Sequence, residues 1–143
     1  MPREVFENLV SDFIFDGLLD NQESLFNKAR SNNPKEFVFT RATGLTVLKT
    51  AQKAHQLNLI KPILIGEQKI IEREAKIIDW PLKTLEIINT TGEEEAVIAS
   101  IERFKTGNVA GFIKGNLHTD MFMSGLVKRD AGVRVGQRLV HVF

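Results

Sequence analysis

A chain of 143 residues with 43% hydrophobic and 26% charged residues has an ordinary globular composition, so one domain with a buried core is expected. The absence of cysteine excludes disulfides, thiolate catalysis and cysteine-containing zinc sites. A formal net charge of +1 argues against a broadly basic nucleic-acid-binding surface, and no apolar run approaches the roughly 18 residues of a membrane span. Because the first residues lack a signal-peptide pattern, we expect a cytoplasmic protein whose partners are small molecules or proteins.

The first 31 residues predict a helical segment. Apolar residues recur at helical spacing across residues 5–15, and an Asp20-x-x-Glu23 capping signal precedes a second short helix. The Ser-Asn-Asn-Pro stretch at residues 31–34 ends that helix, and residues 36–40 are β-rich enough to form the first strand.

From residue 36 onwards, strands and helices alternate. Helices are predicted over residues 43–57 and 67–77, and strands over residues 63–65 and 85–89. Another helix follows a predicted capping box, Thr91-Gly92-Glu93-Glu94, and ends at Gly107; its glutamates suit the positive end of a helix. Its apolar positions predict a buried face made of Val97, Ile98, Ile101 and Phe104.

A strand over residues 109–113, a helix over 118–127 and a strand over 138–143 complete five strands and four helices. This alternation predicts a three-layer α/β/α fold with a mostly parallel sheet. We therefore expect one α/β domain over residues 1–143, with residues 1–31 as a helical extension.

The turn at residues 114–119, Lys-Gly-Asn-Leu-His-Thr, is the best candidate for chemistry. It joins a predicted buried strand to a helix, whose free first amides attract anions. Lys114 supplies a cation, Gly115 permits close approach of a ligand to the backbone, and Asn116, His118 and Thr119 supply polar side chains. The alternative is structural: Lys114 as a solvated strand end, His118 paired with a neighbouring carbonyl, and Asn116 and Thr119 as helix caps.

The same stretch resembles the phosphate acetyltransferase and phosphate butyryltransferase family. The similarity lies in residues 114–119, in Gly132-Val133-Arg134, in Val140-His141-Val142, and in the upstream Lys-Pro-Ile-Leu-Ile-Gly at residues 61–66. It extends over about residues 36–143. Arg134 and His141 are weaker site candidates, because Arg134 suits an exposed position and His141 suits a buried strand.

The resemblance implies reversible transfer of an acetyl or butyryl group between CoA and inorganic phosphate. CoA and acyl-CoA would be substrates, together with phosphate and acyl phosphate, and no cofactor or metal would be bound permanently. It also implies a second domain, which we expect to be absent here together with the family's catalytic serine, arginine and aspartate, so no catalytic residue is assigned. Where relatives carry an arginine suited to the phosphates of CoA, this chain has Ser124.

Two other functions stay open. The chain could be a truncated, non-catalytic α/β domain that acts as an interaction or anion-binding module, or part of another enzyme of similar architecture that binds carboxylates or acid anhydrides. An uncovered sheet edge or face would favour association into a homo-oligomer. Sequence motifs for dinucleotide binding, nucleotide binding and serine hydrolysis do not occur.

Overall fold

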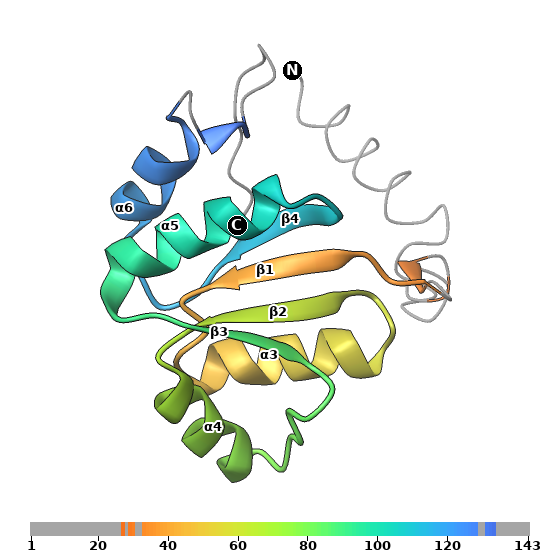
Figure 1. Ribbon diagram of the computed structural model, residues 1–143. Helices are drawn as coiled ribbons and strands as arrows, with labels where there is room; N and C mark the ends of the chain where they lie inside the picture. Colours follow the sequence, from red (N-terminus) through yellow and green to blue (C-terminus); the bar gives the residue numbers. More distant parts are fainter. Residues whose placement is uncertain (1–26, 28, 31–32, 129–130, 134–143) are drawn as a thin grey trace, which may run out of the picture.

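The computed structural model describes residues 27, 29–30, 33–128 and 131–133 (Figure 1). Its strands and helices alternate along the chain. They are β1 (Glu36–Thr40), α3 (Leu45–Gln56), β2 (Lys61–Gly66), α4 (Gln68–Ile77), β3 (Glu86–Asn89), α5 (Gly92–Lys105), β4 (Val109–Lys114) and α6 (Thr119–Leu126). Each element lies within a few residues of the corresponding range predicted from the sequence.

The four strands form one parallel sheet in the order β3-β2-β1-β4. The chain thus builds outwards from β1 to β2 and β3, and then returns to the other side of β1 to form β4. Helix α5 makes this return across the sheet. The predicted α/β class with a parallel sheet is confirmed. The fifth predicted strand, residues 138–143, and almost all of the predicted helical extension lie outside the described residues.

The helices cover both faces of the sheet (Figure 1). Helices α3 and α4 lie on one face and α5 and α6 on the other, as right-handed crossovers require for this strand order. Neighbouring strand residues therefore enter different cores. Phe39 and Leu64 pack with the α3 side, whereas Val38 and Ile63 pack with Ala96 of α5. Burial of the sheet on both faces explains why β2 reads as an uninterrupted apolar run.

The start of α5 differs from the predicted capping box. Thr91 is the N-cap residue, but its side chain makes no capping hydrogen bond. In a capping box a glutamate side chain also accepts a hydrogen bond from the N-cap amide. Here the Thr91 amide donates to Glu95 Oε2 at 2.7 Å, so the glutamate lies one residue later than predicted. Glu94 instead lies on the side of α5 that faces α6. The helix start was therefore predicted correctly, and its capping partner was not.

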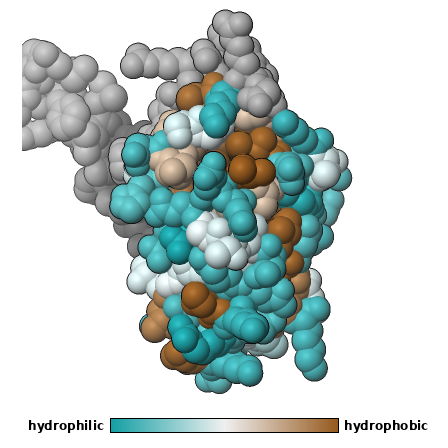
Figure 2. Space-filling view, turned by 60° about the vertical axis from the view of Figure 1, so that its left-hand side comes forward, coloured by the Kyte–Doolittle hydropathy of each residue, from teal (hydrophilic) through white to brown (hydrophobic). Residues whose placement is uncertain are grey.

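One predicted core residue of α5 is exposed. Ile98 is 49% exposed, because it lies at the rim of a groove between α5 and α6 and not against the sheet. The buried positions of this helix are Ala96, Val97 and Ser100. Figure 2 shows a largely hydrophilic surface on the side of the molecule turned forward there, with separate apolar spots.

An ion-pair network ties the amino ends of the strands to α5. Arg103 donates to Glu36 of β1 at 2.7 Å and to Glu86 of β3 at 2.8 Å, and Lys61 of β2 adds a contact to Glu36 at 3.2 Å. Burial alone would raise the pKa of Glu36, but the hydrogen bonds from Lys61 and Arg103 outweigh burial and hold that pKa below its ordinary value. No helix within the described ranges has the length and apolar character needed to cross a bilayer.

Candidate anion site at the carboxyl edge of the sheet

The strand order places a topological switch point between β1 and β4. The chain leaves β1 on one side towards β2, and it enters β4 on the other side. In open α/β sheets, ligands bind outside the carboxyl ends of the strands at such a point. Strand β1 ends there at Thr40 and is followed by Arg41, and the turn at residues 114–119 begins at the last residue of β4 at the same edge. The turn singled out from the sequence therefore lies at the position where this architecture binds ligands.

The turn continues the pairing with β1 beyond the sheet. The Gly115 amide donates to the Thr40 carbonyl at 2.9 Å, and the Asn116 amide donates to the Arg41 carbonyl at 2.9 Å. A Cβ atom on Gly115 would stand 2.6 Å from the Thr40 oxygen and would overlap the Arg41 oxygen as well. Glycine at position 115 thus permits a close approach between two backbone segments of the protein itself.

The polar side chains of the turn also make internal contacts. Lys114 Nζ donates to the Leu117 carbonyl at 2.7 Å, and Asn116 Nδ2 donates to Thr43 Oγ1 at 3.4 Å. Because an ammonium group has three N–H donors, this contact leaves Lys114 with donors for a further acceptor. Lys114 therefore supports the shape of the turn and can still offer charge to a ligand.

Helix α6 begins directly after the turn. His118 is its N-cap residue, Thr119 is its first residue, and the Phe122 amide closes the first turn on the His118 carbonyl at 3.1 Å. The His118 and Thr119 side chains are exposed, and within the described part of the chain no side chain caps the helix start. The first amides of α6 consequently point towards the carboxyl edge of the sheet, where they favour an anion.

Arg41 is a site residue that sequence analysis missed. It follows β1 in a left-handed conformation with φ of 55°, and its guanidinium contacts Glu67 through Nη2 at 3.0 Å and through Nε at 3.4 Å. Its Nη1 donates to the Asn116 carbonyl at 3.2 Å. Burial would raise the pKa of Glu67, but hydrogen bonds from Arg41 and from the Glu67 and Gly92 amides hold it below its ordinary value.

Glu93 joins Arg41 to His118. Its Oε1 atom lies 2.8 Å from His118 Nδ1 and 3.6 Å from Arg41 Nη1. The Glu93 side chain is 21% exposed, whereas the His118 side chain is 81% exposed and open to a ligand. The site therefore brings together Arg41 after β1, two carboxylates at the starts of α4 and α5, and the imidazole at the start of α6.

Five of the eight residues in this candidate cluster were singled out from the sequence. Five predicted residues lie together in the turn and helix start: Lys114, Gly115, Asn116, His118 and Thr119. Arg134 and His141 lie outside the described residues. The missed residues Arg41 and Glu67 each follow a strand directly, which was the available signal; Glu93 was assigned only to the helix end. Within the described part of the chain, no group of three or more acidic or histidine side chains is arranged to hold a metal ion.

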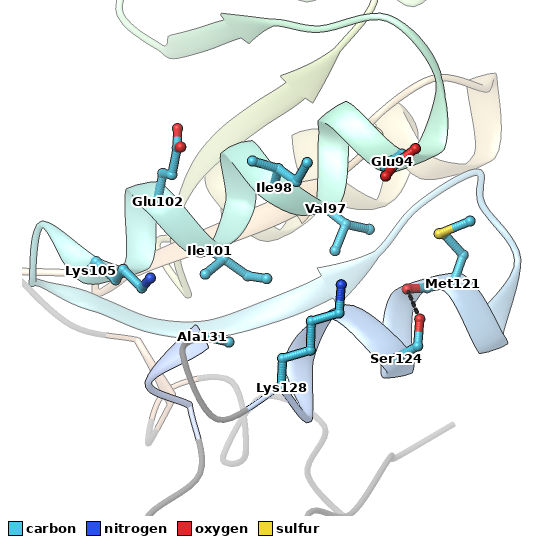
Figure 3. Close-up of a pocket in the computed structure, with 11 residues that line it drawn as sticks. Glu94, Val97, Ile98, Ile101, Glu102, Lys105, Met121, Ser124, Lys128 and Ala131 are labelled. Atoms are coloured by element: carbon cyan, nitrogen blue, oxygen red, sulfur yellow. Dashed lines mark hydrogen bonds between the residues drawn. The ribbon is translucent and has the colours of Figure 1, made fainter.

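A hollow lies between α5 and α6, and none of the residues of the 114–119 turn lines it. It has a volume of about 290 Å³, with Val97 and Ile101 among its apolar lining (Figure 3). Lys128 reaches across it from the end of α6, and Ser124 lines the same side. Ser124 Oγ donates to the Met121 carbonyl at 3.0 Å. The position where the family resemblance suggested an arginine thus belongs to this groove.

Comparisons with known proteins agree on one family. Residues 21–110 match the family described as "Phosphate acetyl/butaryl transferase". A phosphate acetyltransferase of Rickettsia prowazekii is 38% identical, over 85% of this chain and 38% of the relative. A phosphate butyryltransferase of Clostridium beijerinckii is 24% identical, over 85% of this chain and 40% of the relative.

The fold also has a counterpart among solved structures. The EutD phosphotransacetylase from Staphylococcus aureus superposes with a TM-score of 0.53 at 16% sequence identity, over 68% of this chain and 38% of that one. The chain spans between 33% and 42% of the length of the curated relatives it matches. Since the family match covers well over half of its residues, the chain belongs to the phosphate acetyl/butyryl transferase family.

Proposed function

We propose that this chain supplies part of the substrate site of a phosphate acyltransferase, an enzyme that moves an acetyl or butyryl group between CoA and inorganic phosphate. Family membership supports the reaction class. The observation that carries the proposal is the position of the 114–119 turn at the carboxyl edge of the switch point between β1 and β4.

In this proposal the turn and the start of α6 hold the phosphate or acyl phosphate group. Thiolate attack on an acyl phosphate forms the carbon–sulfur bond and expels phosphate, so the leaving group carries the charge that must be stabilised. Lys114, His118 and the first amides of α6 are suited to that task, because they offer a cation and oriented N–H donors. The groups that act on the acyl carbonyl are not assigned to this chain.

The anion role is testable on the chain itself. Phosphate added to the isotopically labelled protein should shift the amide NMR signals of Gly115, Asn116, His118 and Thr119 together. A helix start contributes only about 0.3–1 kcal/mol to an exposed anion, so the expected dissociation constant is millimolar or weaker. Lys114→Ala should weaken the response. Lys128→Ala, which removes an exposed lysine at the α5–α6 groove, is the matched control and should leave it unchanged.

Two results would overturn the proposal. If the turn signals stay still at high phosphate concentration, the turn is a helix cap without an anion function. If Lys114→Ala and Lys128→Ala reduce the response equally, the effect is general electrostatic attraction. An acyl-phosphate assay of this chain, alone and together with the remaining part of a full-length relative, then separates the enzymatic function from a non-catalytic anion-binding module. Substantial turnover only when both are present supports the enzymatic role.

A further inference from the structure

Two side-chain nitrogen atoms lie close to one carboxylate oxygen at the switch point. Arg41 Nη1 lies 3.6 Å and His118 Nδ1 lies 2.8 Å from the same atom, Glu93 Oε1. The three residues come from different elements: the end of β1, the first turn of α5 and the N-cap of α6. Their meeting is therefore a product of the fold and not of local sequence.

The guanidinium of Arg41 is held in a fixed orientation. Glu67 accepts from its Nε and Nη2 atoms, and the Asn116 carbonyl accepts from Nη1. Glu93 Oε1 lies 3.6 Å from the same Nη1 atom. Glu67 itself is anchored by the Gly92 amide at 3.1 Å, so this carboxylate is built into the framework.

Glu93 is held less firmly than Glu67. Its contacts are with the exposed imidazole of His118 and, at a distance beyond hydrogen-bonding range, with Arg41. A guanidinium and an imidazole that converge on one anionic oxygen form the arrangement that also binds a phosphate oxygen. The carboxylate oxygen of Glu93 thus marks where an oxygen of a tetrahedral anion would lie.

We propose that Glu93 is an internal counter-ion that occupies an anion site between Arg41 and His118, and that phosphate or an acyl phosphate binds there by displacing it. This inference rests on the proposed function. It adds that Glu93 weakens the binding of the anion at that site. The two anions exclude each other, because both need the same donors and repel at short distance. Glu93 thereby raises the phosphate concentration at which the site fills.

The adjacent glutamate provides a matched control. Glu94 has the same charge, lies in the same first turn of α5 and lines the α5–α6 groove instead of the switch point. Glu93→Gln and Glu94→Gln therefore change the net charge and the helix-end electrostatics alike. Only the first removes the competing carboxylate.

The experiment is a titration of the 143-residue chain and both variants with inorganic phosphate, followed by NMR. The first readout needs no phosphate: Glu93→Gln should shift the His118 side-chain nitrogen signals, and Glu94→Gln should not. The second is affinity: Glu93→Gln should bind phosphate about two- to fivefold more tightly than the wild type, the range expected for releasing one partly exposed ion pair. Glu94→Gln should differ little from the wild type.

Each other outcome overturns the inference. Equal tightening in both variants indicates a general charge effect, and weaker binding in Glu93→Gln shows that Glu93 positions His118 for the ligand instead of competing with it. If phosphate moves no signal in any of the three proteins, the proposed anion function fails as well. If phosphate binds all three alike, only the role of Glu93 fails. Glu93→Asp, which withdraws the carboxylate by one methylene, should fall between the wild type and Glu93→Gln and guards against misfolding of a single variant.

Discussion

Gly115→Ala should damage the site through its backbone. The added Cβ would overlap the Arg41 carbonyl oxygen and stand 2.6 Å from that of Thr40, and neither atom can move without shifting the end of β1. Relief of the overlap separates the two segments and breaks the hydrogen bonds from Gly115 and Asn116. Two such bonds contribute about 1–3 kcal/mol, and the overpacking adds about 1–3 kcal/mol. We expect the free energy of unfolding to fall by about 2–6 kcal/mol.

Urea denaturation of the purified chain measures this loss. With a slope of about 2 kcal/mol per molar urea, the midpoint should fall by about 1–3 M. Gly111→Ala in the preceding strand, β4, is the matched control, because its Cβ would meet the ring of Phe37, a side chain that can rotate. It should cost less. A Gly115→Ala protein as stable as the wild type, or more stable than Gly111→Ala, would refute the packing argument.

Two other contacts give further predictions. The Ser100 hydroxyl donates to the Ala96 carbonyl, so it accepts a hydrogen bond from the Thr40 hydroxyl at 2.8 Å. Ser100→Ala leaves the buried Thr40 hydroxyl without this acceptor. It should therefore lower the free energy of unfolding, measured in thermal or urea melts, by about 1–3 kcal/mol. A Thr40→Val change added to Ser100→Ala should recover part of that loss, and no recovery would contradict the explanation. Arg103→Met should destabilise the chain near neutral pH, where ionised Glu36 is stabilised by its partners. Because the folded-state pKa of Glu36 is lowered, its contribution to the free energy of unfolding is present above the ordinary carboxyl pKa and is lost as the pH falls through the folded value. The difference in stability between the wild type and Arg103→Met should therefore shrink in melts below about pH 4. A difference that stays constant with pH would argue against this cause.

Hydrophobic periodicity was sufficient to predict the framework. Strand β1 was predicted with the bounds the structure has, and α4 begins one residue later than predicted. These elements are specified by local pattern, since apolar runs mark strands buried on both faces and recurring apolar positions mark the helices. Ile98 was mispredicted because periodicity identifies an apolar face but not whether α6 covers its outer edge.

The candidate site was only partly predictable for a related reason. The turn at residues 114–119 is contiguous, so its polar residues and glycine stand out together. Arg41, Glu67 and Glu93 are separated by at least 25 residues and meet only through the strand order and the crossover of α5. The fold class can be predicted from the pattern of apolar residues alone. Predicting contacts between residues so far apart in the sequence also requires the register of the strands and the rotation of each helix about its axis.

The order β3-β2-β1-β4 also has a kinetic consequence. Strands β1, β2 and β3 are neighbours in both sequence and space, so each pairing closes a loop of one crossover helix. The pairing of β4 with β1 closes a loop that contains all the other strands, and long-range parallel pairing is intrinsically slow. We expect the β1–β3 unit to assemble first and β4 to join it last. His118 and the 114–119 turn would then come next to Arg41 only at this final step. Anion binding at the site would therefore indicate the fully folded protein and not a folding intermediate.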